Sequence, residues 1–246
     1  MVKNIKLIIE YDGTNYSGWQ SQKGRFRTLQ ETIENIIKEI TEEDIELIGC
    51  SRTDAGVHAK GFVANFLTNS RIPGDKFKYA INSRLPEDII IVNSDEVDLE
   101  FHSRYSCISK RYIYKILNTE WPSPINRYYT YHVQKKLNVL DMNEAARYFQ
   151  GTHDFSSFKN IGSSVKTSVR TIIESKVYMD DEMICFSITG NGFLYNMVRI
   201  ITGTLIEVGM GKRKPEDMSV ILSAKDRNMA GKSVPPTGLY LDRVFY

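Results

Sequence analysis

The stretch GCSRTDAGVHA, residues 49–59, is short and polar, contains two glycines, and has an apolar run on either side. The two runs are typical of strands, so the stretch is predicted to be a loop at one end of a sheet. Ala55 and Gly56 permit a tight turn and the close approach of another molecule's backbone. We therefore expect Arg52 and Asp54 to lie at the mouth of a cleft. The simpler interpretation is a hairpin connection in which Asp54 only caps a turn.

The residues around this loop predict a unit with the order strand, helix, strand, strand, helix, strand, as in ferredoxin-like folds. Apolar and charged residues alternate along the first strand, which ends at Asp12 and Gly13. The first helix has apolar residues at helical spacing and begins with the capping-box pattern of Thr28 and Glu31. The predicted elements are the strand 5–11, the helix 28–40, the strands 45–49 and 61–67, the helix 75–85 and a strand from 89.

The rest of the chain repeats this theme without repeating the sequence. Its predicted elements are the strand 110–117, the helix 141–150, a hairpin of strands 172–179 and 183–189, the helices 193–207 and 215–225, and the strand 239–245. We therefore predict an α+β fold of two ferredoxin-like halves, with domains at 1–104 and 105–246. We expect the halves to share a mixed or antiparallel sheet with helices packed on it, because no low-complexity linker separates them. A cleft between two such halves is a natural active site.

Composition limits the class of protein. The chain has 246 residues, 41% hydrophobic and 25% charged, as in soluble globular proteins. No apolar run approaches the ~18 residues of a membrane span, and the N-terminus lacks a signal-peptide pattern. The cysteines are odd in number and far apart, which favours a reducing cytoplasm over a disulfide framework. The four histidines share no metal-binding spacing, so we expect no metal.

The net charge of +2 does not indicate a nucleic-acid-binding protein. An RNA partner would therefore have to be bound by local basic patches. Three such patches lie in predicted loops, and each by itself is also typical of an ordinary solvated surface. They are Lys23, Arg25 and Arg27; Lys159, Lys166 and Arg170; and Lys212, Arg213 and Lys214.

The string at 49–59 resembles the signature loop of the tRNA pseudouridine synthase A family, which is centred on Arg-Thr-Asp-Ala-Gly-Val-His. The resemblance runs in order and spacing from about residue 4 to 244. It includes the first-strand Tyr-Asp-Gly-Thr with Trp19, the segment from Phe101 to Tyr114, and the segments 151–158, 192–211 and 235–241. One departure is Phe62, where the family often has a polar residue. The resemblance implies a cytoplasmic, cofactor-free homodimer that converts uridine to pseudouridine at positions 38 to 40 in the anticodon stem-loop of tRNA.

Pseudouridine formation breaks the N1–C1′ bond of uridine, rotates the base and rejoins it through C5. By resemblance Asp54 is the nucleophile; attack at C1′, attack at C6 and action as a base all stay open. An arginine close to a carboxylate lowers its pKa by ~1–3 units and keeps it ionised. The residues alone leave two candidates for that arginine. Arg52 is two positions from Asp54, and Arg199 lies among apolar residues, where burial of its charge requires a partner.

The resemblance assigns the remaining roles. It makes Arg199 the ion-pair partner of Asp54. It assigns Arg52 to holding the RNA and the flipped nucleotide. Tyr112 stacks on the target base and serves the proton step at C5, and Leu239 packs against the uracil. Arg25 and Arg27, in the first basic loop, are candidate RNA contacts.

Two other classes of function are alternatives to this one. A non-catalytic RNA-binding module could also contain paired ferredoxin-like halves, but the sequence has no RNP string with exposed aromatic residues on a strand. A metal-dependent hydrolase using the histidines is disfavoured by their spacing.

Overall fold

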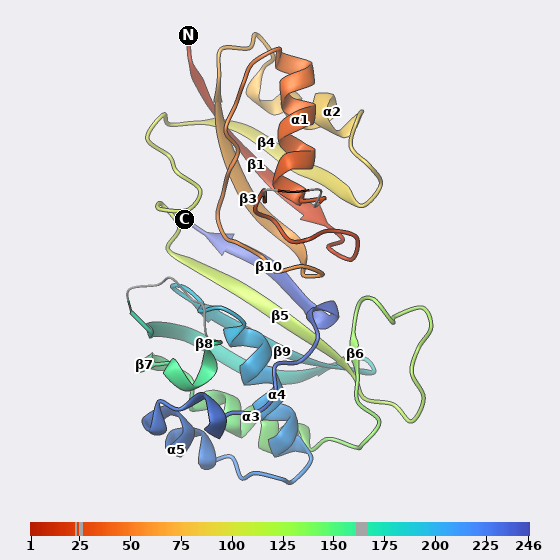
Figure 1. Ribbon diagram of the computed structural model, residues 1–246, viewed down its shortest axis with the longest axis vertical. Coiled ribbons are helices and arrows are strands. Elements are labelled where there is room, and N and C mark those ends of the chain that lie inside the picture. Colours follow the sequence, from red (N-terminus) through yellow and green to blue (C-terminus); the bar gives the residue numbers. More distant parts are fainter. Residues whose placement is uncertain (23, 25–26, 161–166) are drawn as a thin grey trace. The chain divides into compact units, whose positions relative to one another are not determined.

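The computed structural model of the protein describes residues 1–22, 24, 27–160 and 167–246 (Figure 1). Their contacts divide the chain into two units, Met1–Ile108 together with Tyr240–Tyr246, and Ser109–Leu239. The C-terminal strand therefore clusters with the first unit, although it is far from it in sequence. The domain limits predicted at 1–104 and 105–246 stay a prediction.

The first unit consists of β1 (Lys3–Tyr11), α1 (Leu29–Thr41), β2 (Ile48–Gly49), β3 (His58–Thr68), α2 (Phe77–Asn82), β4 (Ile89–Val97) and the C-terminal β10 (Leu239–Phe245) from Tyr240 onward. Its sheet has the antiparallel order β4-β1-β3, with β2 also paired to β3. Strand β10 lies parallel to β3, with Tyr240 beside His58. The predicted β-α-β-β-α-β order of this half is confirmed.

The core of the first unit lies between the sheet and its helices. Ile5, Leu7 and Ile9 alternate with more exposed residues along β1 and are fully buried, as the period of two along a strand requires. Helices α1 and α2 pack together against this sheet (Figure 1), and Ile33 and Ile37 of α1 are buried with them. The apolar stripe predicted for the first helix is therefore its core-facing side.

The second unit consists of β5 (Ser109–Leu117), β6 (Tyr131–His132), α3 (Val139–Arg147), β7 (Gly151–Asp154), β8 (Val169–Asp180), β9 (Met183–Gly190), α4 (Met197–Gly209) and α5 (Asp217–Ala224). Its strands have the antiparallel order β5-β9-β8-β7, and β6 lies parallel to β5. Helix α3 packs on β8 and on α4, so helices again cover a sheet (Figure 1). The predicted α+β fold with two related halves is confirmed, whereas the cleft between them stays a prediction.

The capping box predicted at the start of α1 is wrong. Thr28 has the extended backbone of a cap, but its side chain makes no capping hydrogen bond, and its buried hydroxyl has no partner in the described part of the chain. The helix N–H groups are satisfied by backbone carbonyls instead. Leu29 N donates to Gly18 O at 3.2 Å, and Gln30 N donates to Trp19 O at 3.0 Å. The carbonyls of the preceding loop have taken the place of the threonine oxygen.

The strand predicted at 45–49 is reduced to Ile48–Gly49. Side chains of α1 bind the backbone that precedes it. Leu47 N donates to Glu34 Oε1 at 2.9 Å, and Gln30 Nε2 donates to Leu47 O at 3.0 Å. Because these two backbone groups are bonded to a helix, they do not join the ladder of the sheet.

The helix predicted at 193–207 begins at Met197 and ends at Gly209. Asn196 has a left-handed backbone with a φ of 59°, which a right-handed helix cannot contain. The helix predicted at 75–85 is shorter as well, since a 3₁₀ turn at Gly74–Lys76 precedes α2. Helix α3 begins earlier than predicted, because Asn138 caps it by accepting hydrogen bonds from Leu140 N and Asp141 N.

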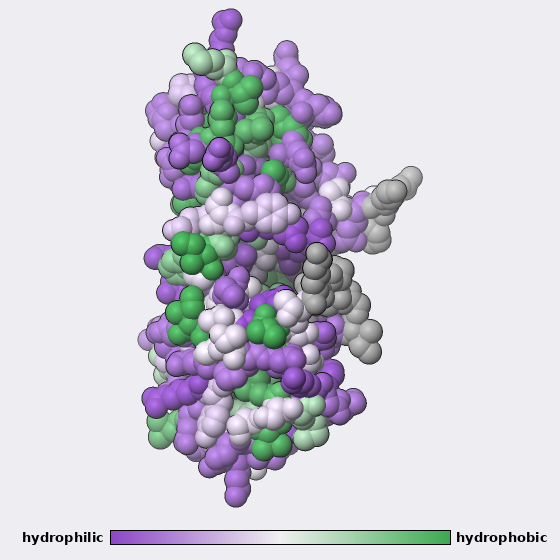
Figure 2. All heavy atoms as spheres, turned by 90° about the vertical axis from the view of Figure 1, so that its left-hand side faces the viewer, coloured by the Kyte–Doolittle hydropathy of each residue, from purple (hydrophilic) through white to green (hydrophobic). Residues whose placement is uncertain are grey.

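The surface is mixed in character. On the face drawn in Figure 2, hydrophobic residues lie in several separate areas with polar and charged residues between them. None of the helices in the described part of the chain is both long and apolar enough to span a bilayer.

Candidate active site

The loop between β2 and β3 carries Asp54 and is fixed by backbone hydrogen bonds. Trp19 N, in the segment after β1, donates to Thr53 O at 3.1 Å. Val57 N donates to Asp54 O at 3.2 Å and closes a turn in which Gly56 has a φ of 76°. Glycine adopts this conformation without steric cost. The tight turn predicted from the sequence is therefore confirmed.

Two glycines allow the segment after β1 to approach this loop. A Cβ atom on Gly13 would lie 2.0 Å from Val57 O, and one on Gly18 would lie 2.6 Å from Thr53 O. Both distances are much shorter than a van der Waals contact, so any larger residue would push the two backbones apart. The backbone of the loop that carries Asp54 is therefore in direct contact with the backbone of the segment after β1.

Aromatic side chains support the loop from inside the first unit. The rings of Trp19 and Phe62 are stacked, with centroids 3.9 Å apart and an interplanar angle of 25°. The Tyr11 hydroxyl lies 2.8 Å from Thr53 Oγ1 in a buried hydrogen bond. Phe62, the one departure from the family pattern, is fully buried in this cluster. Its apolar ring is accommodated because it packs on another aromatic ring.

Burial alternates along the residues that precede the turn. Arg52 is exposed, Thr53 is buried and Asp54 is half-buried. This alternation fits an extended backbone, in which Arg52 and Asp54 lie on the same side and Thr53 on the other. Asp54 therefore remains partly accessible to solvent, as a carboxylate that meets a substrate must be.

Arg27, a predicted RNA contact, has a half-exposed side chain (51% accessible) with Nη2 3.8 Å from Asp88 Oδ1. Its guanidinium lies over the Tyr16 ring, 4.6 Å from the centroid. The Tyr16 hydroxyl donates to the same carboxylate, and burial together with that hydrogen bond raises the pKa of Tyr16. Arg25, the other predicted contact in this loop, lies outside the described residues.

In the second unit, Tyr112 and Tyr114 lie on the same side of β5, as predicted. Tyr112 is 7% exposed and contacts Phe193 edge to face, with centroids 5.0 Å apart. Tyr114 is fully buried and its hydroxyl donates to Pro235 O at 2.7 Å. Burial raises the pKa of Tyr114 and outweighs the opposing effect of the Arg199 charge, so this hydroxyl stays a hydrogen-bond donor.

Arg199 lies in the first turn of α4 and is half-buried. Its Nε donates to Val234 O at 2.7 Å and its Nη1 donates to Asn196 Oδ1 at 2.7 Å. Its own carbonyl accepts a hydrogen bond from Val234 N at 3.3 Å. The guanidinium is therefore fixed in direction, and part of the cost of burying it is offset by these hydrogen bonds.

The segment that leads to Leu239 is bound to α4 and β5. Gly231 N donates to Thr204 Oγ1 at 2.9 Å, and a Cβ atom on Gly203 would lie 1.9 Å from Lys232 O. Together with the contacts of Arg199 and Tyr114, these interactions fix the backbone from 231 to 235. Leu239 is buried and follows the 3₁₀ turn Pro236–Gly238.

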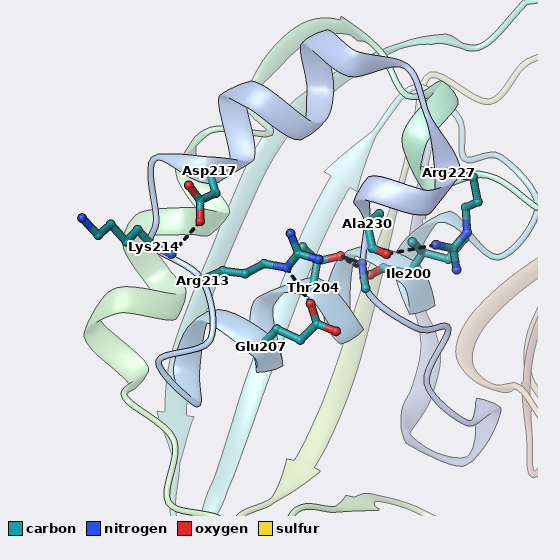
Figure 3. Close-up of polar contacts among 9 residues, drawn as sticks. Ile200, Thr204, Glu207, Arg213, Lys214, Asp217, Arg227 and Ala230 are labelled. Atoms are coloured by element: carbon teal, nitrogen blue, oxygen red, sulfur yellow. Dashed lines mark hydrogen bonds and ion pairs between the residues drawn. The ribbon is translucent and has the colours of Figure 1, made fainter.

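The basic patch at 212–214 is partly neutralised by its own neighbours (Figure 3). Arg213 Nε lies 2.5 Å from Glu207 Oε2 at the end of α4, and both side chains are about a quarter exposed (26% and 27%). Lys214 is tied by its backbone, since its N–H donates to Asp217 Oδ2 at 2.9 Å. Lys212 and Lys214 are exposed. In the second patch, Lys159 Nζ donates to Ser168 Oγ at 2.7 Å, and Lys166 lies outside the described residues.

His132, His153 and Ser156 make local structural contacts. His132 Nε2 lies 2.8 Å from Thr119 O, and His153 Nε2 lies 2.7 Å from Gln150 O. Ser156 Oγ donates to Asp154 Oδ1 at 2.7 Å, which stabilises the turn that contains both residues. That hydrogen bond, together with Lys225, lowers the pKa of Asp154.

The geometry of the first unit is that of a partly accessible carboxylate on a rigid loop, and the second unit holds a fixed arginine and a buried tyrosine. Residues 7–106 and 145–246 match the family model for tRNA pseudouridine synthase. The chain is 56% identical over 247 residues to "tRNA pseudouridine synthase A 2" of Clostridium tetani and 56% identical over 245 residues to "tRNA pseudouridine synthase A" of Acetivibrio thermocellus. Both alignments cover the whole of each chain. The protein belongs to the tRNA pseudouridine synthase A family.

Three contacts of the candidate site were not foreseen from the sequence. Asn196 binds Arg199, Tyr114 binds the segment before Leu239, and His58 contacts the segment after β1. An asparagine directly before a helix was a usable signal, because asparagine tolerates the left-handed backbone found at 196. The contacts of Tyr114 and His58 join residues far apart in sequence and had no local signal.

Proposed function

We propose that this chain isomerises uridine to pseudouridine at positions 38 to 40 in the anticodon stem-loop of tRNA, with Asp54 as the nucleophile. The observation that carries the proposal is the loop at 50–57, where a half-buried carboxylate stands on a turn fixed by backbone hydrogen bonds. Membership of the tRNA pseudouridine synthase A family supports the reaction and the class of substrate.

The chemistry requires that the target base leave its stack and remain bound after it is detached from the sugar. The N1–C1′ bond breaks, a C5–C1′ bond forms, the proton at C5 is lost to a base and N1 takes up a proton, so substrate and product have the same composition. We assign Tyr112 to stacking on the base, which is worth ~1–3 kcal/mol per base in comparable contacts. Its hydroxyl is assigned to the proton step at C5.

We assign Arg199 as the group that keeps Asp54 ionised. The hydrogen bonds of Arg199 to Val234 and Asn196 support this role, because they fix the guanidinium before a substrate binds. Arg52, which is exposed beside Asp54, is assigned to the RNA, and Leu239 to packing against the uracil. A cytoplasmic location, a homodimer and independence from cofactors complete the proposal.

Tritium release from an unmodified tRNA transcript labelled at C5 of uridine tests the proposal, because the reaction displaces the C5 proton. We expect release without any added cofactor and in the presence of a chelator. Transcripts in which uridines 38, 39 and 40 are replaced by cytidine, singly and together, locate the target. Release that continues unchanged with all three replaced contradicts the assigned positions. Binding of tRNA without any release favours the RNA-binding module.

Neutralising Lys212 and Lys214 should weaken tRNA binding and reduce its salt dependence. Both side chains are exposed, whereas Arg213 is paired with Glu207 (Figure 3). The double variant Lys212→Gln/Lys214→Gln should lower the slope of log Kd against log salt by about 1.5, if each lysine neutralises one phosphate. Arg213→Gln should change it less.

The control for this measurement is Lys38→Gln, an exposed lysine on α1 that is paired with Asp44. Its slope should match that of the unmodified protein. The salt-dependence slope of Arg27→Gln is compared with the same control. The Arg27 guanidinium lies near the Asp88 carboxylate, so its charge is partly balanced. Equal slopes in the double variant and in the control would remove the 212–214 patch from the RNA interface.

A further inference from the structure

His58 is the first residue of β3 and follows directly on the turn that contains Asp54. It is 2% exposed, although it is a polar residue at the end of a strand. Its ring lies on that of Tyr240 in β10, with centroids 4.9 Å apart and an interplanar angle of 28°. Its position is therefore set by packing on one face and by polar contacts at its edge.

The polar contacts of His58 reach the turn after β1. Gly13 N donates to His58 Nδ1 at 3.1 Å, and the same Nδ1 lies 3.1 Å from Asp12 Oδ1. In the contact with Gly13 the backbone N–H is the donor and the imidazole Nδ1 is the acceptor. Asp12 Oδ1 accepts from Thr14 N at 2.9 Å and from Thr14 Oγ1 at 2.6 Å, which fixes the turn that presents the Gly13 N–H.

These contacts join the turn after β1 to the end of the Asp54 loop. Gly13 lies so close to Val57 that a Cβ atom on it would stand 2.0 Å from Val57 O. The hydrogen bond from Gly13 to His58 acts across that same contact, one residue further along. The two interactions together determine how far the end of the loop stands from β1, and Val57 N is in turn bonded to Asp54 O.

We propose that His58 is a positioning residue for the reaction: its Nδ1, acting as an acceptor for Gly13 N–H, sets the orientation of the Asp54 carboxylate. The inference rests on the proposed role of Asp54. It also gives the Tyr-Asp-Gly-Thr sequence at 11–14 a function, because that sequence presents the N–H group to which His58 is bonded. Small displacements of a reacting group are costly, about 100-fold in rate for 1 Å.

Two substitutions of similar size separate this role from simple packing. His58→Asn places an amide oxygen close to the position of Nδ1 and keeps the acceptor, whereas His58→Leu fills the space without one. We expect kcat for tritium release to fall about 10- to 100-fold in His58→Leu. We expect His58→Asn to stay near the kcat of the unmodified protein, and KM for tRNA and the midpoint of thermal unfolding to be similar in the two variants.

Equal losses of kcat in His58→Asn and His58→Leu, or no loss in His58→Leu, would overturn the proposal. If His58→Leu does not fold, His58→Gln replaces it, because its amide reaches one methylene too far to accept from Gly13; its kcat should lie well below that of His58→Asn. Asp54→Asn is measured alongside. Full activity of Asp54→Asn would remove the proposed nucleophile and this inference with it, whereas an inactive Asp54→Asn with equal His58 variants refutes the positioning role alone.

Discussion

Asp54→Asn should abolish turnover and leave tRNA binding nearly unchanged. The substitution removes the negative charge and the nucleophilic oxygen but preserves the shape of a half-buried side chain on a loop whose backbone is bonded to Trp19. Removal of a nucleophile typically lowers kcat by at least about 10⁴-fold. Tritium release and a filter-binding Kd for the same tRNA measure the two quantities separately.

Two further variants make this result decisive. Asp54→Ala shows that no activity arises from slow deamidation of the asparagine to aspartate. Asp154→Asn is the matched control, since Asp154, the last residue of β7, is also a partly accessible carboxylate but is bonded to Ser156 and Lys225. It should retain the turnover of the unmodified protein. Turnover in Asp54→Ala comparable to that of this control would end the assignment of Asp54 as the nucleophile.

Arg199→Leu should lower kcat by about 150- to 5000-fold, the effect expected if it is the proposed partner of Asp54 and its removal costs the about 3–5 kcal/mol of a broken ion pair that substrate closes from water. Arg199→Lys should lie between this variant and the unmodified protein. Lysine keeps the charge but cannot reproduce the planar group that binds Val234 O and Asn196 Oδ1 together. Single-turnover tritium release at saturating tRNA measures the effect on the chemical step.

A structural role of Arg199 has to be separated from its chemical role, because its side chain also binds the segment that leads to Leu239. Arg227 provides the comparison: it too binds a backbone carbonyl, that of Ala230 (Figure 3), and an asparagine, Asn160. Arg227→Leu should lower the midpoint of thermal unfolding but not the single-turnover rate. A loss of rate in Arg227→Leu equal to that in Arg199→Leu would assign the effect to structure.

The fold could be predicted from the sequence wherever periodicity and burial coincide. Ile5, Leu7 and Ile9 alternate along a strand, and Ile33 and Ile37 recur at helical spacing, so their buried faces followed from the pattern alone. The turn at Gly56 also had a local signal, because its left-handed backbone requires a residue such as glycine.

Prediction failed where partners distant in sequence decide local structure. Thr28 is a residue type that often caps a helix. Here, however, the carbonyls of Gly18 and Trp19 accept the hydrogen bonds of the first helix N–H groups, and the Thr28 side chain does not. Leu47 belongs to an apolar run, yet it bonds to helix side chains instead of to a strand. Single-sequence patterns do not contain such competition, since it depends on which backbone groups the fold brings together.

In the candidate site, too, local motifs could be recognised in the sequence, whereas contacts between distant residues could not. The motifs of the sequence predict Asp54, Arg199 and Tyr112 as site residues, but they do not predict the contacts that Arg199 and the end of the Asp54 loop make in the fold. His58 and Gly13 are 45 positions apart, and Arg199 and Val234 are 35 positions apart. A contact of that length leaves no periodicity in the chain, so only the folded backbone reveals it.

The packing of Trp19 has an optical consequence. The chain contains two tryptophans, and Trp121 is 72% exposed, whereas Trp19 is buried and its backbone N–H donates to Thr53 O in the loop that carries Asp54. Gly49 lies so close to the Trp19 indole that a Cβ atom there would stand 2.4 Å from Nε1. In a Trp121→Phe protein, all indole fluorescence therefore originates beside the loop that carries Asp54. The emission of that single ring reports changes in the loop in real time, without an attached dye.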